Sequence, residues 1–207
     1  QVVIEAAGTD SLLTTSGGMN IRAGALGNGP RGGAVLVEAS GGGLIQQGGL
    51  FDINANALGT MATFGEAGTA RGGTITLDLS DEGRLTANNI LFESIANGGF
   101  SDFGTGGQAV GGQILVSADN ASFTVSGNQT FRSIGNGGSS AQADGGAGRS
   151  DGIFFNIDNG AVWEAASGVT RIELLGQGGA GGGDYFSDPT SGGIGTGGLL
   201  LLRALGA

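Results

Sequence analysis

A pair of glycines that opens an alternating apolar run recurs along this chain at an almost fixed interval. The five copies begin at Gly32, Gly72, Gly111, Asp151 and Gly197, the fourth with Asp in place of the first glycine. The second residues of successive copies lie 40, 39, 40 and 46 residues apart. A repeat of this length predicts one small unit of strands stacked on copies of itself, because such a unit cannot bury its apolar face alone.

A second marker, an aliphatic residue followed by a small and a polar residue, runs out of phase with the first. Its copies begin at Leu26, Leu58, Ile95, Ile134 and Leu175. From the second residue of a glycine pair to the next aliphatic marker the chain takes 25, 22, 22 and 23 steps. Such lengths suit one turn of three short strands. The period-two alternation and the 48 glycines exclude helices. The sequence therefore predicts one all-β domain over residues 1–207, a right-handed parallel β-helix (β-solenoid) of about five turns of 22–25 residues.

Stacking should align equivalent residues of successive turns into interior rows. The predicted rows are Val35, Ile75, Ile114, Phe154 and Leu200; Val37, Leu77, Val116, Asn156 and Leu202; and the five aliphatic markers. Asn156 breaks the apolar pattern. A slip of one residue would instead place Ile153, Phe155 and Ile157 inside and Asn156 outside, and the two registers exclude each other. We favour the slip because it buries three large side chains.

Glycine-rich excursions of growing length follow each aliphatic marker, at residues 27–31, 59–71, 96–110, 135–150 and 176–196. We expect all of them to leave the stack at one corner and to line one edge, where loops on a rigid scaffold commonly make contacts. The predicted contact residues are the aromatic side chains Phe64, Phe100, Phe103, Tyr185 and Phe186. Alternatively, these rings fold back over outward-facing apolar residues such as Leu36, Leu115 and Phe155.

The composition excludes several kinds of site. The chain has no His and no Cys, so zinc, copper, haem and iron–sulfur clusters lose their usual ligands, and serine nucleophiles lose their usual base. Calcium remains, with Asp184 and Asp188 as weak candidate ligands. The net charge of −10 disfavours nucleic acids and anionic membranes as partners. No apolar stretch is long enough to predict insertion into a membrane.

Charged residues at equivalent positions of neighbouring turns have two interpretations. Glu93, Arg132 and Glu173 predict an alternating charge ladder on the outer face, which would help to fix the register. Glu38 and Asp78 share a position outside the core, and Asp81 and Glu82 follow at one corner. Paired carboxylates facing a groove are the machinery of glycoside hydrolysis, so this corner is the candidate site of an enzyme.

The Gly-Gly-x-Ile-x-Leu openings, the Asn-Gly corners and the acidic, Cys-free composition resemble the β-solenoid passenger regions of secreted Gram-negative surface proteins. These are autotransporter passengers and filamentous-haemagglutinin-like adhesins. The resemblance extends from Gly17 to Leu202. It implies a right-handed parallel β-helix, export to the bacterial cell surface, and an adhesive or filament-forming role, and it carries over no catalytic residue.

The sequence thus predicts a non-enzymatic extracellular structural and adhesive β-solenoid without a cofactor. The expected partners are other copies, end to end, and glycans or proteins of host or cell surfaces. We read the chain as a segment or open-ended subunit of a longer assembly. The alternative is a polysaccharide-degrading lyase or glycosidase, and a third hypothesis is a calcium-dependent binding module.

Overall fold

The computed structural model describes residues 1–182 and 191–205. Within these ranges the chain forms strands, turns and bends and contains no helix. Accordingly, the described residues include no helix long and apolar enough to cross a membrane. All strand pairings are parallel. The architecture is all-β, with parallel strands stacked in order, as in a β-solenoid.

The strands form three sheets, which we call A, B and C. Sheet A contains β1 (Val2–Ala7), β5 (Ala34–Ser40), β9 (Thr74–Ser80), β12 (Gln113–Asp119), β16 (Gly152–Asp158) and β20 (Leu199–Leu205). Sheet B contains β2 (Leu12–Thr15), β3 (Met19–Arg22), β4 (Ala25–Gly27), β6 (Leu44–Asn54), β7 (Ala57–Gly59), β10 (Arg84–Asn97), β13 (Ser122–Val125), β14 (Gln129–Asn136), β17 (Val162–Ala165) and β18 (Thr170–Gln177). Sheet C contains β8 (Ala70–Arg71), β11 (Ala109–Val110), β15 (Gly148–Arg149) and β19 (Gly195–Thr196).

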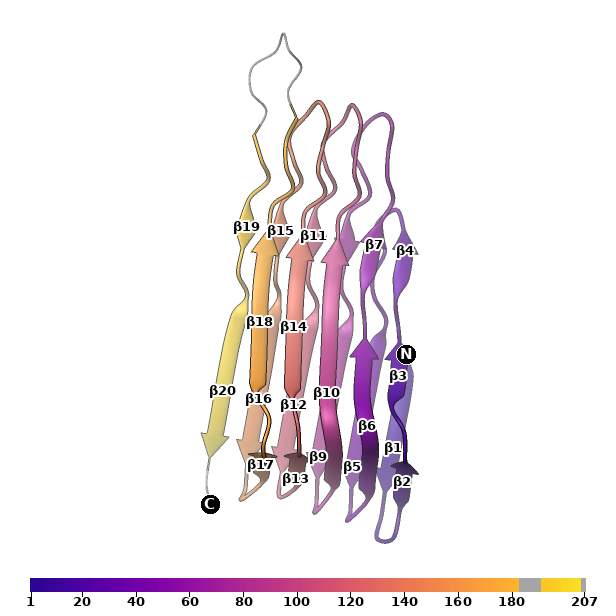
Figure 1. Ribbon diagram of the computed structural model, residues 1–207, viewed down its shortest axis with the longest axis vertical. Coiled ribbons are helices and arrows are strands. Elements are labelled where there is room, and N and C mark those ends of the chain that lie inside the picture. The colour runs from indigo at the N-terminus through magenta and orange to yellow at the C-terminus, as the bar shows by residue number, and fades with distance from the viewer. Residues whose placement is uncertain (183–190, 206–207) are drawn as a thin grey trace.

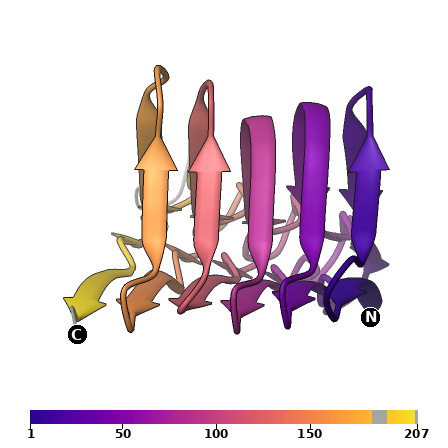
Figure 2. The ribbon, with the colours of Figure 1, turned by 90° about the horizontal axis from the view of Figure 1, so that it is seen from below.

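Successive repeats form successive layers. The strands of sheet A lie in the order β1-β5-β9-β12-β16-β20, and Figures 1 and 2 show the layers following one another from the N-terminus to the C-terminus. The backbone hydrogen bonds that pair the strands of one layer therefore join it to the layer before it and the layer after it. The glycine-pair spacing corresponds to one complete layer with its excursion.

The glycine pairs lie where the chain passes into sheet A and neighbouring layers touch through their backbones. A Cβ atom added at Gly73 would lie 1.9 Å from the carbonyl oxygen of Gly33, and one at Gly112 would lie 1.9 Å from that of Gly73. No side chain fits at such a distance. The most conspicuous repeat of the sequence is thus a packing requirement of the corner.

The slipped register of β16 is confirmed. Ile153 pairs with Ile114, and Phe155 pairs with Val116. Ile153 and Phe155 are buried, and Ile157 packs partly buried against the same core. Asn156 is half-buried on the opposite face. Burial of large apolar side chains decides between two registers that backbone hydrogen bonding alone would not distinguish.

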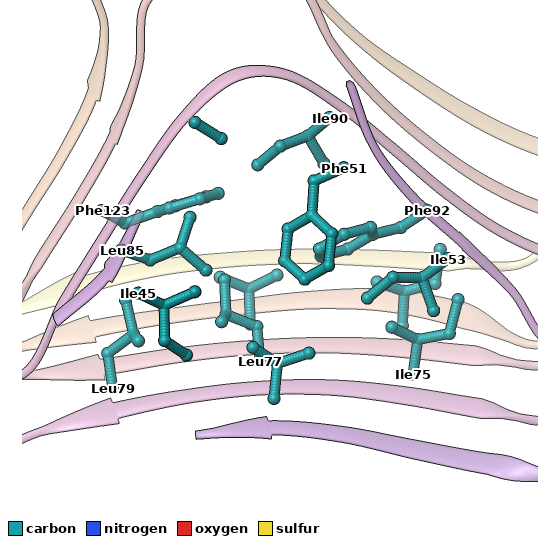
Figure 3. Close-up of a cluster of buried hydrophobic side chains, with 14 of the residues drawn as sticks. Ile45, Phe51, Ile53, Ile75, Leu77, Leu79, Leu85, Ile90, Phe92 and Phe123 are labelled. Atoms are coloured by element: carbon teal, nitrogen blue, oxygen red, sulfur yellow. The ribbon is translucent and has the colours of Figure 1, made fainter. Parts of the chain in front are cut away.

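The interior is filled from both main sheets. In Figure 3, Phe51 and Phe92 of sheet B lie against Leu77 and Ile75 of sheet A. Aromatic rings continue this core along the stack. The contacts are edge-to-face for Phe51–Phe92 (5.7 Å), Phe92–Phe131 (5.6 Å) and Phe131–Phe155 (5.0 Å), and parallel for Phe155–Trp163 (4.6 Å). Such pairs add to the stabilisation that burial alone provides.

The predicted interior row of aliphatic markers is wrong for four of its five members. Leu26, Leu58 and Leu175 are exposed and Ile95 is half-buried, whereas Ile134 is buried. Residues two apart on a strand share one face, so Ile95 lies on the outer face together with Glu93. The buried side chains at this narrow corner are small; they are Ala57, Ala70, Ala96 and Ala109.

Candidate functional site

The excursions stack on one another as predicted, in the part of the chain that the structure describes. Residues 60–69, 98–108 and 137–147 form arches that connect sheet B to sheet C, and in Figure 1 they lie side by side beyond the ends of the strands. Parallel bridges link Ala62 to Ser101 and Ser101 to Ser140. Backbone hydrogen bonds such as Ala62 N–H to Phe100 O (2.9 Å) continue the pairing. We call this stack of three arches the arch ladder.

A buried serine holds the second arch to the first and the third arch to the second. The Ser101 hydroxyl donates to the carbonyl oxygen of Gly65 (2.9 Å) and accepts the backbone N–H of Gly104 (2.9 Å). The Ser140 hydroxyl repeats this with Gly104 (2.7 Å) and Ala143 (2.8 Å). Each hydroxyl thus fixes the turn of its own arch and the distance to its neighbour. The one signal for this role in the sequence is that both serines follow an Asn-Gly-Gly corner by the same distance.

The base of the arch ladder is built of glycine. Gly107 N–H donates to Gly99 O in the same arch (2.9 Å), and Gly99 N–H donates to Gly68 O in the preceding one (2.9 Å). Gly146 and Gly138 repeat the first of these bonds at 2.7 Å. The two legs of each arch therefore touch backbone to backbone, without an apolar core between them.

Two of the predicted contact residues come together on this edge. The rings of Phe64 and Phe103 stack with centroids 5.1 Å apart and planes 12° apart, although the two residues remain 78% and 50% exposed. Phe100 is 37% exposed and has no ring partner among the described residues. Tyr185 and Phe186 lie outside the described residues.

The alternative, that these rings cover outward-facing apolar residues, is wrong for Phe155. This residue is 1% exposed and belongs to the core, so its ring is not available from outside. The stacked rings of Phe64 and Phe103 instead cover each other on one face. The outer face of Phe64 is open, because the preceding excursion, residues 27–31, is too short to form an arch.

A groove of about 340 Å³ lies along the second halves of the arches, which lead to sheet C. Its lining includes Glu66, Thr105 and Asp144, which come from three successive arches, together with glycine backbone. The Asp144 carboxylate accepts the backbone N–H of Ser191 (2.7 Å) and so joins the fourth excursion to the fifth. The groove offers hydroxyl and carboxylate groups, including Glu66 and Thr105 from the two arches that carry the aromatic pair. Its carboxylates were not among the predicted contact residues, because the arch lengths differ and their register was unknown.

The candidate catalytic acids are less concentrated than the sequence suggested. Glu38 and Asp78 do pair in register on neighbouring strands of sheet A. The corner pocket nearby, about 270 Å³, is lined by Glu82 and by Arg84, but by neither Asp78 nor Asp81. The predicted acids therefore do not face one groove together.

The charge ladder on the outer face of sheet B is confirmed. Arg132 contacts Glu93 through Nη1 (2.6 Å) and Glu173 through Nε (2.6 Å), and Arg171 also pairs with Glu173. Burial opposes ionisation of the Glu173 carboxyl, but hydrogen bonds from the two arginines outweigh it and lower its pKa. Burial likewise opposes the charge of Arg132, but the two carboxylates raise its pKa. Burial and the nearby Glu93 raise the pKa of Asp52 on the same face.

Replacing Glu173 by glutamine should lower the free energy of unfolding at neutral pH, and the loss should shrink in acid. The folded-state pKa of this carboxyl lies below its ordinary value of 4.5. The stabilisation is therefore fully present above that value and is lost as the pH falls through the folded pKa. Urea unfolding from neutral pH to about pH 3 measures the difference. Glu164→Gln replaces an exposed side chain that forms no ion pair within residues 1–182 and 191–205, and at neutral pH it should change the free energy of unfolding by less than about 0.5 kcal/mol. A difference for Glu173→Gln that stays constant with pH would contradict the prediction.

No metal-binding cluster is found in residues 1–182 and 191–205, where no three acidic side chains converge. The predicted calcium ligands Asp184 and Asp188 lie outside the described residues. Comparison with family models, with curated proteins and with solved structures finds no match to this chain. Among the described residues, the arch ladder with its stacked aromatic pair is the most developed candidate surface.

Proposed function

We propose that this chain is a non-enzymatic structural and adhesive β-solenoid that makes its contacts through the arch ladder. We also propose that its layers form a right-handed parallel β-helix of about five turns of 22–25 residues. The observation that carries it is the exposed Phe64–Phe103 stack on a backbone-bonded edge. An exposed aromatic face on a rigid scaffold is costly in water unless a partner covers it.

The chemistry of the edge favours sugars or mixed polar and aromatic surfaces as partners. The open face of Phe64 accepts the apolar face of a sugar ring or another aromatic ring, and the adjacent groove offers Glu66, Thr105 and Asp144 to hydroxyl groups. By its resemblance to secreted surface proteins, we place the chain at the exterior of a bacterial cell. End-to-end association is a second proposed contact, supported by the exposed leucines of β20.

Binding to immobilised cell-surface glycans tests the proposal. The Phe64→Ala and Phe103→Ala double variant should bind at least about tenfold more weakly than the wild type, because the aromatic face is the apolar centre of the contact. Val169→Ala removes a comparably exposed apolar side chain from the turn between β17 and β18, outside the arch ladder, and should bind like the wild type.

Two results would contradict the proposal. Unchanged binding by the double variant would mean that the aromatic pair is not the contact. Release of sugar fragments from the glycans by the wild-type chain would favour the polysaccharide-degrading enzyme instead. In that case Asp78→Ala should abolish the release without unfolding the chain.

A further inference from the structure

Arginine side chains are concentrated along one row at the corner formed by sheet C. Arg31 forms a parallel bridge with Arg71, Arg71 pairs with Val110, and Val110 pairs with Arg149. This row has one position in each of four successive layers, and arginine occupies three of the four. These three are among only eight basic residues in an acidic chain. Neighbouring layers are about 4.8 Å apart, so Arg31 and Arg71 are directly adjacent.

The positive charge of this row is only partly neutralised. Arg71 reaches two layers along the stack to Asp151, with Nη2 and Oδ2 3.2 Å apart. Over residues 1–182 and 191–205, neither Arg31 nor Arg149 forms an ion pair. Like charges directly opposite on neighbouring strands are destabilising. The fold thus holds Arg31 against Arg71 without an internal carboxylate between them.

A pocket lies between these two arginines. It has a volume of about 290 Å³ and is lined by Arg31 and Arg71, together with Thr69, Gln108 and backbone of the first excursion. None of its lining residues is acidic. The backbone N–H of Arg71 donates to the carbonyl oxygen of Pro30 (2.9 Å), and this bond holds the first excursion over the second layer. The pocket is therefore assembled from three layers and is not a gap beside one flexible loop.

The chemistry of the pocket indicates an anionic ligand. A guanidinium group donates two parallel hydrogen bonds to a carboxylate, sulfate or phosphate, and two adjacent guanidinium groups can share one such group. The volume approaches that of small-molecule sites and exceeds what a bare inorganic ion fills. The Thr69 hydroxyl and the Gln108 amide supply both donors and acceptors for hydroxyl groups.

We propose that this pocket binds an acidic sugar, with Arg31 and Arg71 holding its carboxylate and Thr69 and Gln108 pairing with its hydroxyl groups. The site lies on sheet C and the first excursion, apart from the Phe64–Phe103 stack. The proposal therefore stands independently of the proposed function.

Calorimetric titration of the full chain with glucuronate, glucose, sulfate and phosphate tests the site. Glucuronate should bind saturably and more weakly as salt is added, and glucose should not bind, because only the carboxylate engages the arginines. Arg31→Gln should weaken glucuronate binding by about tenfold or more, the effect of losing a charge-assisted hydrogen bond. Arg84→Gln removes one positive charge from an exposed arginine of sheet B and should bind like the wild type.

The thermal midpoint separates a binding role from a structural one. Arg31 has no carboxylate partner among the described residues, so unliganded Arg31→Gln should be no less stable than the wild type, while glucuronate should raise the midpoint of the wild type only. Equal binding by Arg31→Gln, or no binding of any anion, would overturn the site. Binding of sulfate and phosphate but not glucuronate would overturn the sugar as its ligand.

Discussion

Phe131→Ala is expected to lower the free energy of unfolding by about 3–5 kcal/mol, the usual cost of truncating a buried aromatic residue. Phe131 is fully buried, and its ring contacts those of Phe92 in the preceding layer and of Phe155 and Trp163 in the following layer. Its removal leaves a cavity between sheets A and B that rigid neighbouring layers cannot close. Urea unfolding measures the loss, which is a large share of the stability of an ordinary domain.

Phe64→Ala is the matched control for this substitution. The same ring is removed, but from a residue that is 78% exposed, so the free energy of unfolding should change by less than about 0.5 kcal/mol. Hydrogen exchange should also localise the effect of Phe131→Ala to β12, β14 and β16, because each layer depends mainly on its neighbours. A loss below about 1 kcal/mol for Phe131→Ala would contradict continuous aromatic packing along the stack.

Gly107→Ala is expected to destabilise the arch ladder by about 3 kcal/mol, at the upper end of the usual cost of overpacking. The added Cβ would lie 2.1 Å from the carbonyl oxygen of Gly68 and 2.7 Å from the nitrogen of Gly99. Both atoms belong to the backbone, so neither can move aside as a flexible side chain would. Loss of hydrogen-exchange protection at Gly99 and Gly138, together with a lower unfolding midpoint, would show the effect.

Gly192→Ala is expected to raise the free energy of unfolding, in contrast to Gly107→Ala. The nearest atom to its added Cβ is the carbonyl oxygen of Gly179 at 3.6 Å, an ordinary contact. Replacing glycine by alanine where the backbone permits it stabilises by about 0.4–1 kcal/mol, because the unfolded chain loses freedom. If Gly107→Ala were equally harmless, the legs of the arches could not be packed backbone to backbone.

The layered architecture was predictable because its signals are local and repeated. Glycines such as Gly73 and Gly112, each the second of a pair, mark a corner where no side chain fits, so the spacing of the pairs gives the layer. The charge ladder of Glu93, Arg132 and Glu173 followed from that spacing alone. The register of β16 that places Ile153 and Phe155 inside was also predictable, because only that register buries large residues.

The outer row of aliphatic markers was not predictable by the same argument. In the first two copies the marker lies two residues further along the strand than in the later copies. Leu58 therefore pairs with Asn97 and not with Ile95. Apolar character alone then suggested burial. Glu93 was already assigned to the outer face, and Ile95, two residues further along the same strand, must lie on that face too.

The details of the candidate surfaces depend on the register between excursions of unequal length. Phe64 and Phe103 each lie eight residues before a glycine pair, so counting back from the pairs aligns them. Backbone bonds and the serine hydroxyls of the arches hold that alignment in the structure. The arginine row left a similar signal. Arg31 and Arg71 each directly precede a glycine pair, so the layer spacing alone places them side by side.

The parallel stacking of the layers has a mechanical consequence. The backbone hydrogen bonds that join layers point along the stack, whereas the strands run across it. Tension applied along the stack would therefore detach layers one after another at modest force. Tension applied along the strands of two neighbouring layers would shear a whole row of bonds at once and meet far greater resistance. A chain of this design resists a sideways pull on its arches better than a pull on its ends.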